Sequence, residues 1–220
     1  HKLLTYPRTD SKHLPEDYVP TVKETLSAMV PAEGLGKFAQ NILEQGWVKP
    51  NKRVFDNSKV SDHFAIIPTP LSPKLTALSE AESKIYDMVA RRFLAVFFPP
   101  AQYLVTTRIT QIDDLHFKTE GKVLVEPGWL AVMGRDRADP EAALPKLSPQ
   151  GAMAESAQMQ HVECHALHTR PPARFSEASL LSAMESAGKR VDEEDWREAM
   201  AEKGLGTPAT RAAIIEGLLS

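Results

Sequence analysis

The stretch SEAESKIYDMVARRFLAVFFPP, residues 79–100, decides how the chain is organised. It begins with a capping-box pattern, in which a serine and a glutamate three residues later satisfy free N–H groups at a helix start. Apolar residues from Ile85 to Phe93 then recur at helical spacing, and Pro99-Pro100 stops the pattern. We therefore predict one long amphipathic helix here and a change of structure after it.

The chain before this helix also carries helical patterns. Residues 19–30 and 35–43 each place apolar side chains at helical spacing. Pro20 is acceptable in the first turn of the first pattern, and Gly46 is placed to end the second. Residues 1–100 are therefore predicted to be mainly helical.

β-branched residues become frequent after the two prolines. Residues 103–112 and 116–125 are predicted to be strands joined by a polar turn, and residues 129–133 and 158–167 to be a third and a fourth strand. Residues 135–154, rich in alanine, proline and charge and without periodicity, are predicted to be a long loop.

Helical signals return from Arg170. Ser176 is a predicted N-cap of a helix that ends at Gly188, and residues 192–203 form a second predicted helix that ends at Gly204. The chain is thus predicted to be helical, then β, then helical again.

Composition describes an ordinary soluble protein of 220 residues, with 42% hydrophobic and 25% charged residues. The net charge of −3 lacks the basic surplus of a free-standing nucleic-acid binder, so composition alone does not indicate DNA. The single cysteine, Cys164, excludes an internal disulfide and is compatible with a reducing cytoplasm. The apolar run at residues 93–98 is too short to span a bilayer.

A cluster around the cysteine superficially suggests a zinc site. His161, His165 and His168 lie close to Cys164 in the sequence. Strand alternation would place His161 and His165 on one face and the other two on the opposite face. Because four ligands must converge on zinc, the pattern does not predict a zinc site.

A tyrosine and an arginine lie near the start of the chain, in the segment Leu3-Leu4-Thr5-Tyr6-Pro7-Arg8-Thr9-Asp10-Ser11. Pro7 disfavours the helical region for Tyr6, so the stretch is predicted to be extended or a turn. An extended segment would put Tyr6 and Arg8 on the same face. A neutral phenol is a weak nucleophile, and a nearby guanidinium favours the phenolate and offers paired donors to a phosphate. This is the minimum equipment for attack on a phosphodiester. On the pattern alone, however, a surface loop is by far the more common explanation.

The segment Gly204-Leu205-Gly206-Thr207-Pro208-Ala209-Thr210-Arg211 is a second candidate site. Thr207 is predicted to cap a helix with Pro208 in its first position, and a helix N-terminus suits a phosphate. Thr210 adds a hydroxyl and Arg211 a cation. The alternative is a well-capped helix that follows a glycine-rich turn.

The segments just quoted, together with Ser61-Asp62-His63-Phe64-Ala65-Ile66-Ile67-Pro68-Thr69 and Pro171-Pro172-Ala173-Arg174-Phe175-Ser176-Glu177-Ala178-Ser179-Leu180, form an ordered set. This set resembles the type IA DNA topoisomerases, most closely the bacterial topoisomerase III branch. Members carry an N-terminal Toprim domain before the catalytic tyrosine. The resemblance therefore implies that this chain is an internal fragment of a larger enzyme.

The resemblance implies an α+β multi-domain fragment. Residues 1–100 would be a helical, winged-helix-like catalytic portion, residues 101–169 a β arch, and residues 170–220 a helical portion that binds single-stranded DNA. The first and last portions would be partial domains.

The resemblance also implies the reaction. Tyr6 would attack a phosphodiester of single-stranded DNA to give a 5′-phosphotyrosyl enzyme, a second strand would pass through the gap, and the strand would be rejoined without nucleotide hydrolysis. Arg8 would orient the scissile phosphate. His63, which on sequence alone reads as a structural histidine, would support the same phosphate region. Many topoisomerase III sequences have a second histidine after it, and the role of that imidazole cannot hold for Phe64.

Arg174, Thr207, Thr210 and Arg211 would contact the DNA backbone, with Thr207 the weakest candidate because the family can have a basic residue there. The ligands of Mg²⁺ would lie in the absent Toprim domain, so no cofactor is expected in this fragment. The fragment alone is expected to be inactive, and its parent to act in the cytoplasm at the bacterial nucleoid, without a membrane partner. A non-catalytic DNA-binding module and a purely structural fragment remain alternatives.

Overall fold

A computed structural model of the protein describes residues 1–9, 11–60, 62–71, 77–135, 143–144, 158, 160–161, 163–190, 192–201 and 204–219. The chain divides into two compact units, His1–Pro149 and Gln150–Ser220. It is a mixed α and β protein, as predicted. The division into three functional portions remains a prediction.

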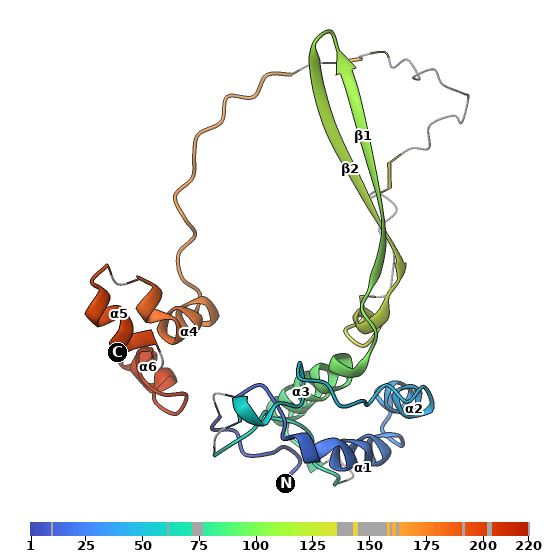
Figure 1. The fold of residues 1–220 in the computed structure, drawn as a ribbon, viewed down its shortest axis with the longest axis vertical. Coiled ribbons are helices and arrows are strands. Elements are labelled where there is room, and N and C mark those ends of the chain that lie inside the picture. The colour runs from blue at the N-terminus through green and yellow to red at the C-terminus, as the bar shows by residue number, and fades with distance from the viewer. Residues whose placement is uncertain are drawn as a thin grey trace. The chain divides into compact units, whose positions relative to one another are not determined.

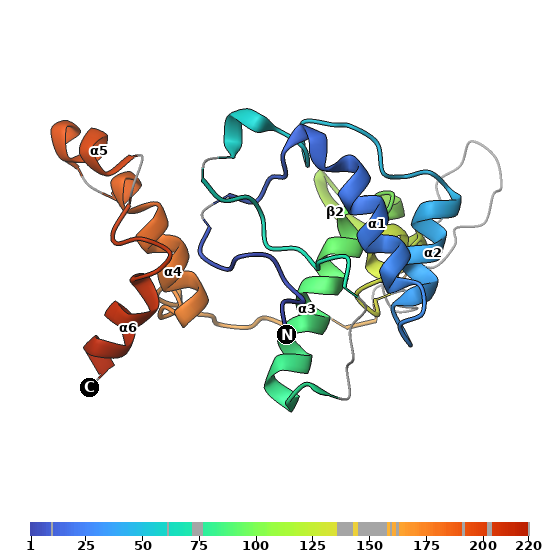
Figure 2. The same ribbon diagram turned by 90° about the horizontal axis from the view of Figure 1, so that it is seen from below.

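The first unit begins with helices (Figure 1). Both predicted early helices are confirmed: a proline stands in the first turn of α1 (Val19–Met29), and Gly46 follows α2 (Gly36–Glu44) with a φ of 62°. The contacts between α1 and α2 place them side by side (Figure 2). The elements of this part are the short 3-10 helix η1 (Glu16–Tyr18), α1 (Val19–Met29), α2 (Gly36–Glu44), the 3-10 helix η2 (Asn57–Lys59) and α3 (Glu80–Phe97).

The capping box of α3 is confirmed. The backbone N–H of Glu82 donates to Ser79 Oγ at 3.3 Å, and the Ser79 N–H donates to Glu82 Oε2 at 2.8 Å. The hydrogen bond from the Ser79 backbone, together with that from its hydroxyl, lowers the pKa of the Glu82 carboxyl from its ordinary value of 4.5. The helix ends at Phe97, and the next residue turns to an extended ψ of 152° ahead of the two prolines.

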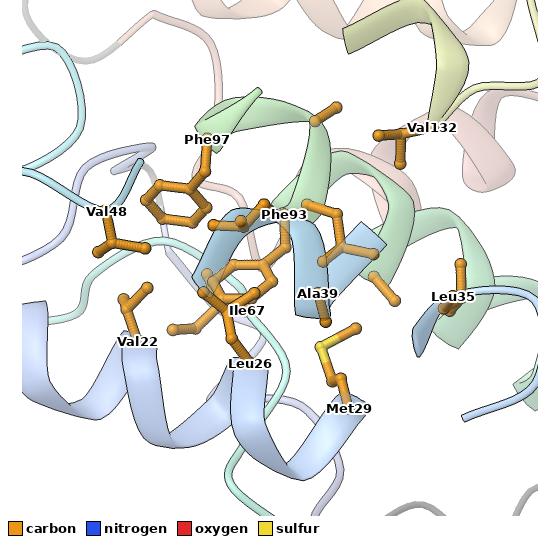
Figure 3. Packing of buried hydrophobic residues seen from close by; sticks show 14 of the residues in the cluster. Val22, Leu26, Met29, Leu35, Ala39, Val48, Ile67, Phe93, Phe97 and Val132 are labelled. Atoms are coloured by element: carbon orange, nitrogen blue, oxygen red, sulfur yellow. The ribbon is translucent and has the colours of Figure 1, made fainter. Parts of the chain in front are cut away.

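One hydrophobic core holds the helices of the first unit together. Figure 3 shows Val22, Leu26 and Met29 on one face of α1, pointing toward Phe93 of α3. Burying a side chain of this size contributes about 1.5–3 kcal/mol to folding. Residues outside the helices join the same core, among them Leu14, Val48, Phe55 and Ile67.

A two-stranded antiparallel sheet follows α3. Strands β1 (Gln102–Ile112) and β2 (Leu115–Glu126) pair along their length (Figure 1). The turn between them places Asp113 at a φ of 50°. The first two predicted strands are thus confirmed, each with slightly wider bounds.

The third predicted strand is wrong. Residues 128–131 form a 3-10 helix, η4 (Gly128–Ala131), and a turn follows. Gly128 has a φ of 48°, and the Trp129 N–H donates to the carbonyl oxygen of Pro99 at 3.0 Å. This segment therefore folds back on the end of α3, where an extended strand would lose that hydrogen bond.

The fourth predicted strand is also wrong where the structure describes it, because residues 158, 160–161 and 163–167 have no regular secondary structure. The described residues of this segment pair with no strand. The predicted loop at 135–154 lies outside the described residues, except for Arg135 and residues 143–144.

The second unit is helical, as predicted. Ser176 caps its first helix and accepts a hydrogen bond from the Ser179 N–H. That helix ends at Glu185, ahead of the predicted Gly188, because a 3-10 turn follows. The last helix begins at Arg211, after a turn at 208–210 that was expected to be helical. The elements are α4 (Glu177–Glu185), the 3-10 helix η6 (Ala187–Arg190), α5 (Glu194–Ala201) and α6 (Arg211–Leu219).

In the part of the chain that the structure describes, no helix has the length and apolar character that a bilayer-spanning helix needs.

Candidate active site around Tyr6

The residues just before Tyr6 are hydrogen-bonded to residues 65–69. The Thr5 N–H donates to the Ile67 carbonyl and the Thr69 N–H to the Leu3 carbonyl, each at 2.9 Å. The Thr5 hydroxyl donates to the Ala65 carbonyl at 3.1 Å and accepts from the Ile67 N–H at 2.9 Å. Two segments far apart in the sequence are thereby fixed side by side.

Tyr6 and His63 are brought together by this pairing. Their ring centroids are 4.5 Å apart with an interplanar angle of 37°. Tyr6 is 52% exposed, and His63 is exposed as well. The contact restricts the orientation of the phenol while its ring stays open to solvent, which is what a nucleophile for a large substrate requires.

The guanidinium of Arg8 is exposed and has no hydrogen-bond or ion-pair partner among the residues that the structure describes. It is therefore available to an anion close to Tyr6 in the chain. Asp10 and Ser61, which belong to the same two motifs, lie outside the described residues.

Small hydroxyl residues make hydrogen bonds that hold the two segments of the site together. The sequence patterns did not predict this role for them. The Thr9 hydroxyl donates to the His63 carbonyl at 3.3 Å, and the Ser11 hydroxyl donates to the Lys59 carbonyl at 2.6 Å. The Ala65 N–H donates to the His13 carbonyl at 2.9 Å. The sequence signal for this role was the serine and threonine at alternate positions after Tyr6, because such residues often hydrogen-bond to backbone groups of irregular segments.

Phe64 does not belong to the exposed site. Its ring packs against Tyr18 with centroids 4.6 Å apart, and its side chain is half-buried. Neighbouring residues therefore diverge, because His63 faces solvent beside Tyr6 while Phe64 joins the edge of the core.

A buried carboxylate organises the turn before His63. Asp56 accepts hydrogen bonds from the Ser58 hydroxyl at 2.6 Å and from the Ser58 N–H at 3.1 Å. The hydroxyl bond is the main cause that lowers the pKa of Asp56 below its ordinary value of 3.8. The carboxylate caps η2 and so fixes the path of the chain toward the Tyr6 site.

The second unit contains the other predicted site. Gly204 and Gly206 have φ of 60° and 67°, which lets the chain turn tightly ahead of α6. The Thr210 hydroxyl accepts from the Thr207 N–H at 2.8 Å and lies 3.1 Å from the Thr207 hydroxyl. Both threonines are exposed at the start of the helix.

Arg211 is engaged within its own unit. Only 7% of the residue is exposed, and its Nε donates to the Leu205 carbonyl at 3.1 Å. The same guanidinium forms an ion pair with Glu185 at 3.2 Å and reaches the Gly206 carbonyl at 3.4 Å. These contacts tie the glycine-rich turn to the end of α4. Contact of Arg211 with a phosphate remains a prediction, as it does for the exposed Arg174.

Among the described residues, no three histidine, cysteine or acidic side chains are grouped so that they could hold a metal ion. His161 and His165 lie 3.9 and 3.4 Å from the Glu163 carboxylate, and Cys164 is exposed.

Comparison with known proteins identifies relatives that are similar in sequence to this chain. A family model described as DNA topoisomerase matches residues 1–220. The DNA topoisomerase 3 of Bacillus licheniformis is 42% identical over 224 residues, which cover 100% of this chain and 30% of the relative. The proteins of the same name from Bacillus subtilis and Shouchella clausii are 40% and 37% identical over 229 and 223 residues, covering all of this chain and 31% and 30% of the relatives. The chain thus spans about three tenths of the length of these relatives.

Proposed function

This chain belongs to the DNA topoisomerase family, within its type IA, topoisomerase III branch, and we propose on that premise that it supplies the nucleophile for opening a DNA strand. The observation that carries the proposal is the exposed Tyr6 ring, held against His63 on a hydrogen-bonded pair of segments. Such a tyrosine combines access for a large substrate with a fixed position.

In the proposed reaction, the Tyr6 oxygen attacks a phosphorus of single-stranded DNA. A bond forms from this oxygen to phosphorus, the bond from phosphorus to the 3′-oxygen breaks, and the leaving strand takes up a proton as a 3′-hydroxyl. The phenolic proton passes to solvent. The reverse attack of the 3′-hydroxyl rejoins the strand and frees Tyr6. The phosphodiester energy is conserved in the tyrosyl linkage, so no nucleotide is hydrolysed.

Arg8 would orient the attacked phosphate and offset the negative charge that develops on it, because its guanidinium is exposed beside Tyr6 in the chain. His63 would hold the phenol ring and support the same phosphate. In the second unit, the exposed Thr207, Thr210 and Arg174 would contact the strand backbone. We assign Arg211 to shaping the turn that presents the two threonines.

Mg²⁺ does not fit the residues that the structure describes, since no suitable group of ligands is present among them. We expect its ligands in a Toprim domain outside these 220 residues. We further propose that the chain by itself is inactive and binds single strands weakly, and that the whole enzyme acts in the cytoplasm at the bacterial nucleoid.

The test is covalent trapping. The chain, joined to the Toprim domain of a relative, is incubated with Mg²⁺ and a 3′-labelled single-stranded oligonucleotide, then denatured. We expect a labelled protein band that is absent in Tyr6→Phe. If Tyr6→Phe binds the strand equally and still gives the band, the nucleophile is another residue. If no variant gives a band although the strand binds, the chain is a DNA-binding module without this chemistry.

A further inference from the structure

A pocket of about 640 Å³ opens in the first unit, beside the segment that carries Tyr6. Its walls come from residues 9 and 11–14, from residues 53–54 and 65–67, and from α3. A pocket of this size is typical of sites for small organic groups.

The rim of the pocket is cationic. Lys12, Arg53 and Arg92 line it, and none of the acidic residues that the structure describes does. All three are exposed, and within the described residues none of their charged groups has a hydrogen-bond or ion-pair partner. By contrast, Arg91 is paired with Asp87 at 2.7 Å on the same helix. The net charge of the chain is −3, so a rim with cations alone is a local feature that favours an anion.

A buried imidazole also lines the pocket. His13 is 8% exposed, and its ring has no hydrogen-bond partner among the residues that the structure describes. Its backbone groups are already used, since its N–H donates to Ser11 Oγ and its carbonyl accepts from Ala65. Among the described residues no fully buried side-chain nitrogen or oxygen lacks a hydrogen-bond partner, so the ring nitrogens of His13 are open to the pocket, where solvent or a ligand can reach them.

The remaining wall is apolar. Ile66, Val89 and Phe93 line it, and Ile66 is 37% exposed. An apolar wall beside unpaired cations suits a ligand that joins a flat, weakly polar body to a negative charge. A nucleotide has this combination, because its base can lie on apolar side chains while its phosphate contacts the cations.

The pocket is linked to the tyrosine. Thr9 lines the pocket and donates to the His63 carbonyl at 3.3 Å, and the His63 ring contacts Tyr6. We propose that this pocket binds one nucleotide of a single DNA strand, close to the phosphate that Tyr6 attacks. Lys12, Arg53 and Arg92 hold its phosphate, and His13 donates to a polar atom of the nucleotide. This inference rests on the proposed function, because that function is what brings a DNA strand to the pocket.

The test is a nuclear magnetic resonance titration of the 220-residue chain with the trinucleotide of thymidylate. We expect shifts in the backbone amides of residues 11–14, 65–67 and 88–93. Thymidine and inorganic phosphate should each bind at least about tenfold more weakly, because each lacks one part of the nucleotide. The mononucleotide has both parts and should shift the same amides.

Substitutions separate the pocket from other surfaces. Arg53→Gln and Arg92→Gln should each lower the affinity about three- to tenfold and reduce the slope of log affinity against log salt by about 0.7. Lys52→Gln, a neighbouring exposed cation outside the pocket, should change neither quantity. Ile66→Glu places a carboxylate at the wall and should lower the affinity more than about tenfold. Ile66→Gln introduces a side chain of nearly the same shape as glutamate but without the charge, and should have a much smaller effect.

The proposal is overturned if the trinucleotide leaves these amides unshifted at millimolar concentration, or if inorganic phosphate or thymidine binds as tightly as the trinucleotide. Equal effects of Ile66→Glu and Ile66→Gln would also overturn it. Tyr6→Phe should leave the titration unchanged. Binding in the pocket without any tyrosyl adduct would thus refute the proposed function alone, and an adduct without binding here would refute this inference alone.

Discussion

His63 makes one contact through its ring and another through its backbone. Its ring packs on the Tyr6 ring, and its backbone carbonyl accepts from the Thr9 hydroxyl. Either the ring contact or a polar contact of the imidazole with DNA could make the residue important, and these roles respond differently to substitution.

We predict that His63→Ala slows adduct formation in the trapping assay about 10- to 100-fold, which corresponds to about 1.4–2.7 kcal/mol. His63→Phe keeps an aromatic ring beside Tyr6 and should restore part of the rate if packing is the main role. Single-turnover rates with the Toprim domain present measure this. Unchanged rates in both variants would contradict any role of His63 at the site.

Arg211 is predicted to contact DNA, and it also has a structural role within the second unit. The side chain of Arg211 is 9% exposed, whereas that of its ionic partner Glu185 is 65% exposed. The guanidinium also serves the carbonyls of Leu205 and Gly206. Removing the buried partner should therefore cost more than removing the exposed one.

We predict that Arg211→Met destabilises the second unit by about 2–4 kcal/mol, because the carbonyls in the turn lose their donors. Glu185→Gln should cost at most about 1 kcal/mol, since an exposed ion pair contributes little. Urea unfolding followed by resonances of α4 and α6 measures both. An equal loss of unfolding free energy in the two variants would contradict this structural role of Arg211.

At the scale of elements, helix α3 was the most predictable part of the chain. Its start follows from the capping box at Ser79 and its end from the two prolines, and both signals are local. The hairpin was predictable for the same reason, since β-branched residues flank a polar turn. Residues 129–133 were mispredicted because the fold of Trp129 depends on the distant Pro99 carbonyl, which no local pattern reveals.

The capping box makes stability depend on pH. The pKa of Glu82 is lowered in the folded state, so its contribution is fully present above the ordinary value of 4.5 and is lost as the pH falls through the lowered value. We predict that the wild-type chain loses more stability than Glu82→Gln when the pH falls below about 4.5. Urea midpoints of both proteins across this range measure it. Parallel profiles would contradict a lowered pKa.

The turn after the hairpin offers a matched pair of glycines. A Cβ at Gly128 would lie 2.4 Å from the Pro99 carbonyl oxygen, whereas a Cβ at Gly134 would meet nothing within 4 Å. Both residues have positive φ, 48° and 69°. We predict that Gly134→Ala costs about 1 kcal/mol from backbone strain and that Gly128→Ala costs clearly more. Thermal unfolding of the two variants measures the difference, and equal losses would refute the packing of this turn on Pro99.

At the scale of the whole molecule, the predicted functional residues are divided between two units. Tyr6, Arg8 and His63 belong to the first, and the predicted backbone contacts at Thr207 and Thr210 belong to the second. The pairing of Tyr6 with His63 was predictable only from resemblance, because nothing local joins them. The hydroxyls of Thr9 and Ser11 that stabilise the site were not predicted, since their carbonyl partners lie far away in the sequence.

The central claim is that Tyr6 forms the covalent bond to DNA. The most direct measurement is mass spectrometry of the trapped adduct, made with the Toprim domain and Mg²⁺ present, after digestion of protein and DNA. We predict that the peptide containing Tyr6 carries the added mass of a nucleotide 5′-phosphate and that no other peptide does. A nucleotide on Tyr18, Tyr86 or Tyr103, or an unmodified Tyr6 peptide in a sample that contains adduct, would contradict the account.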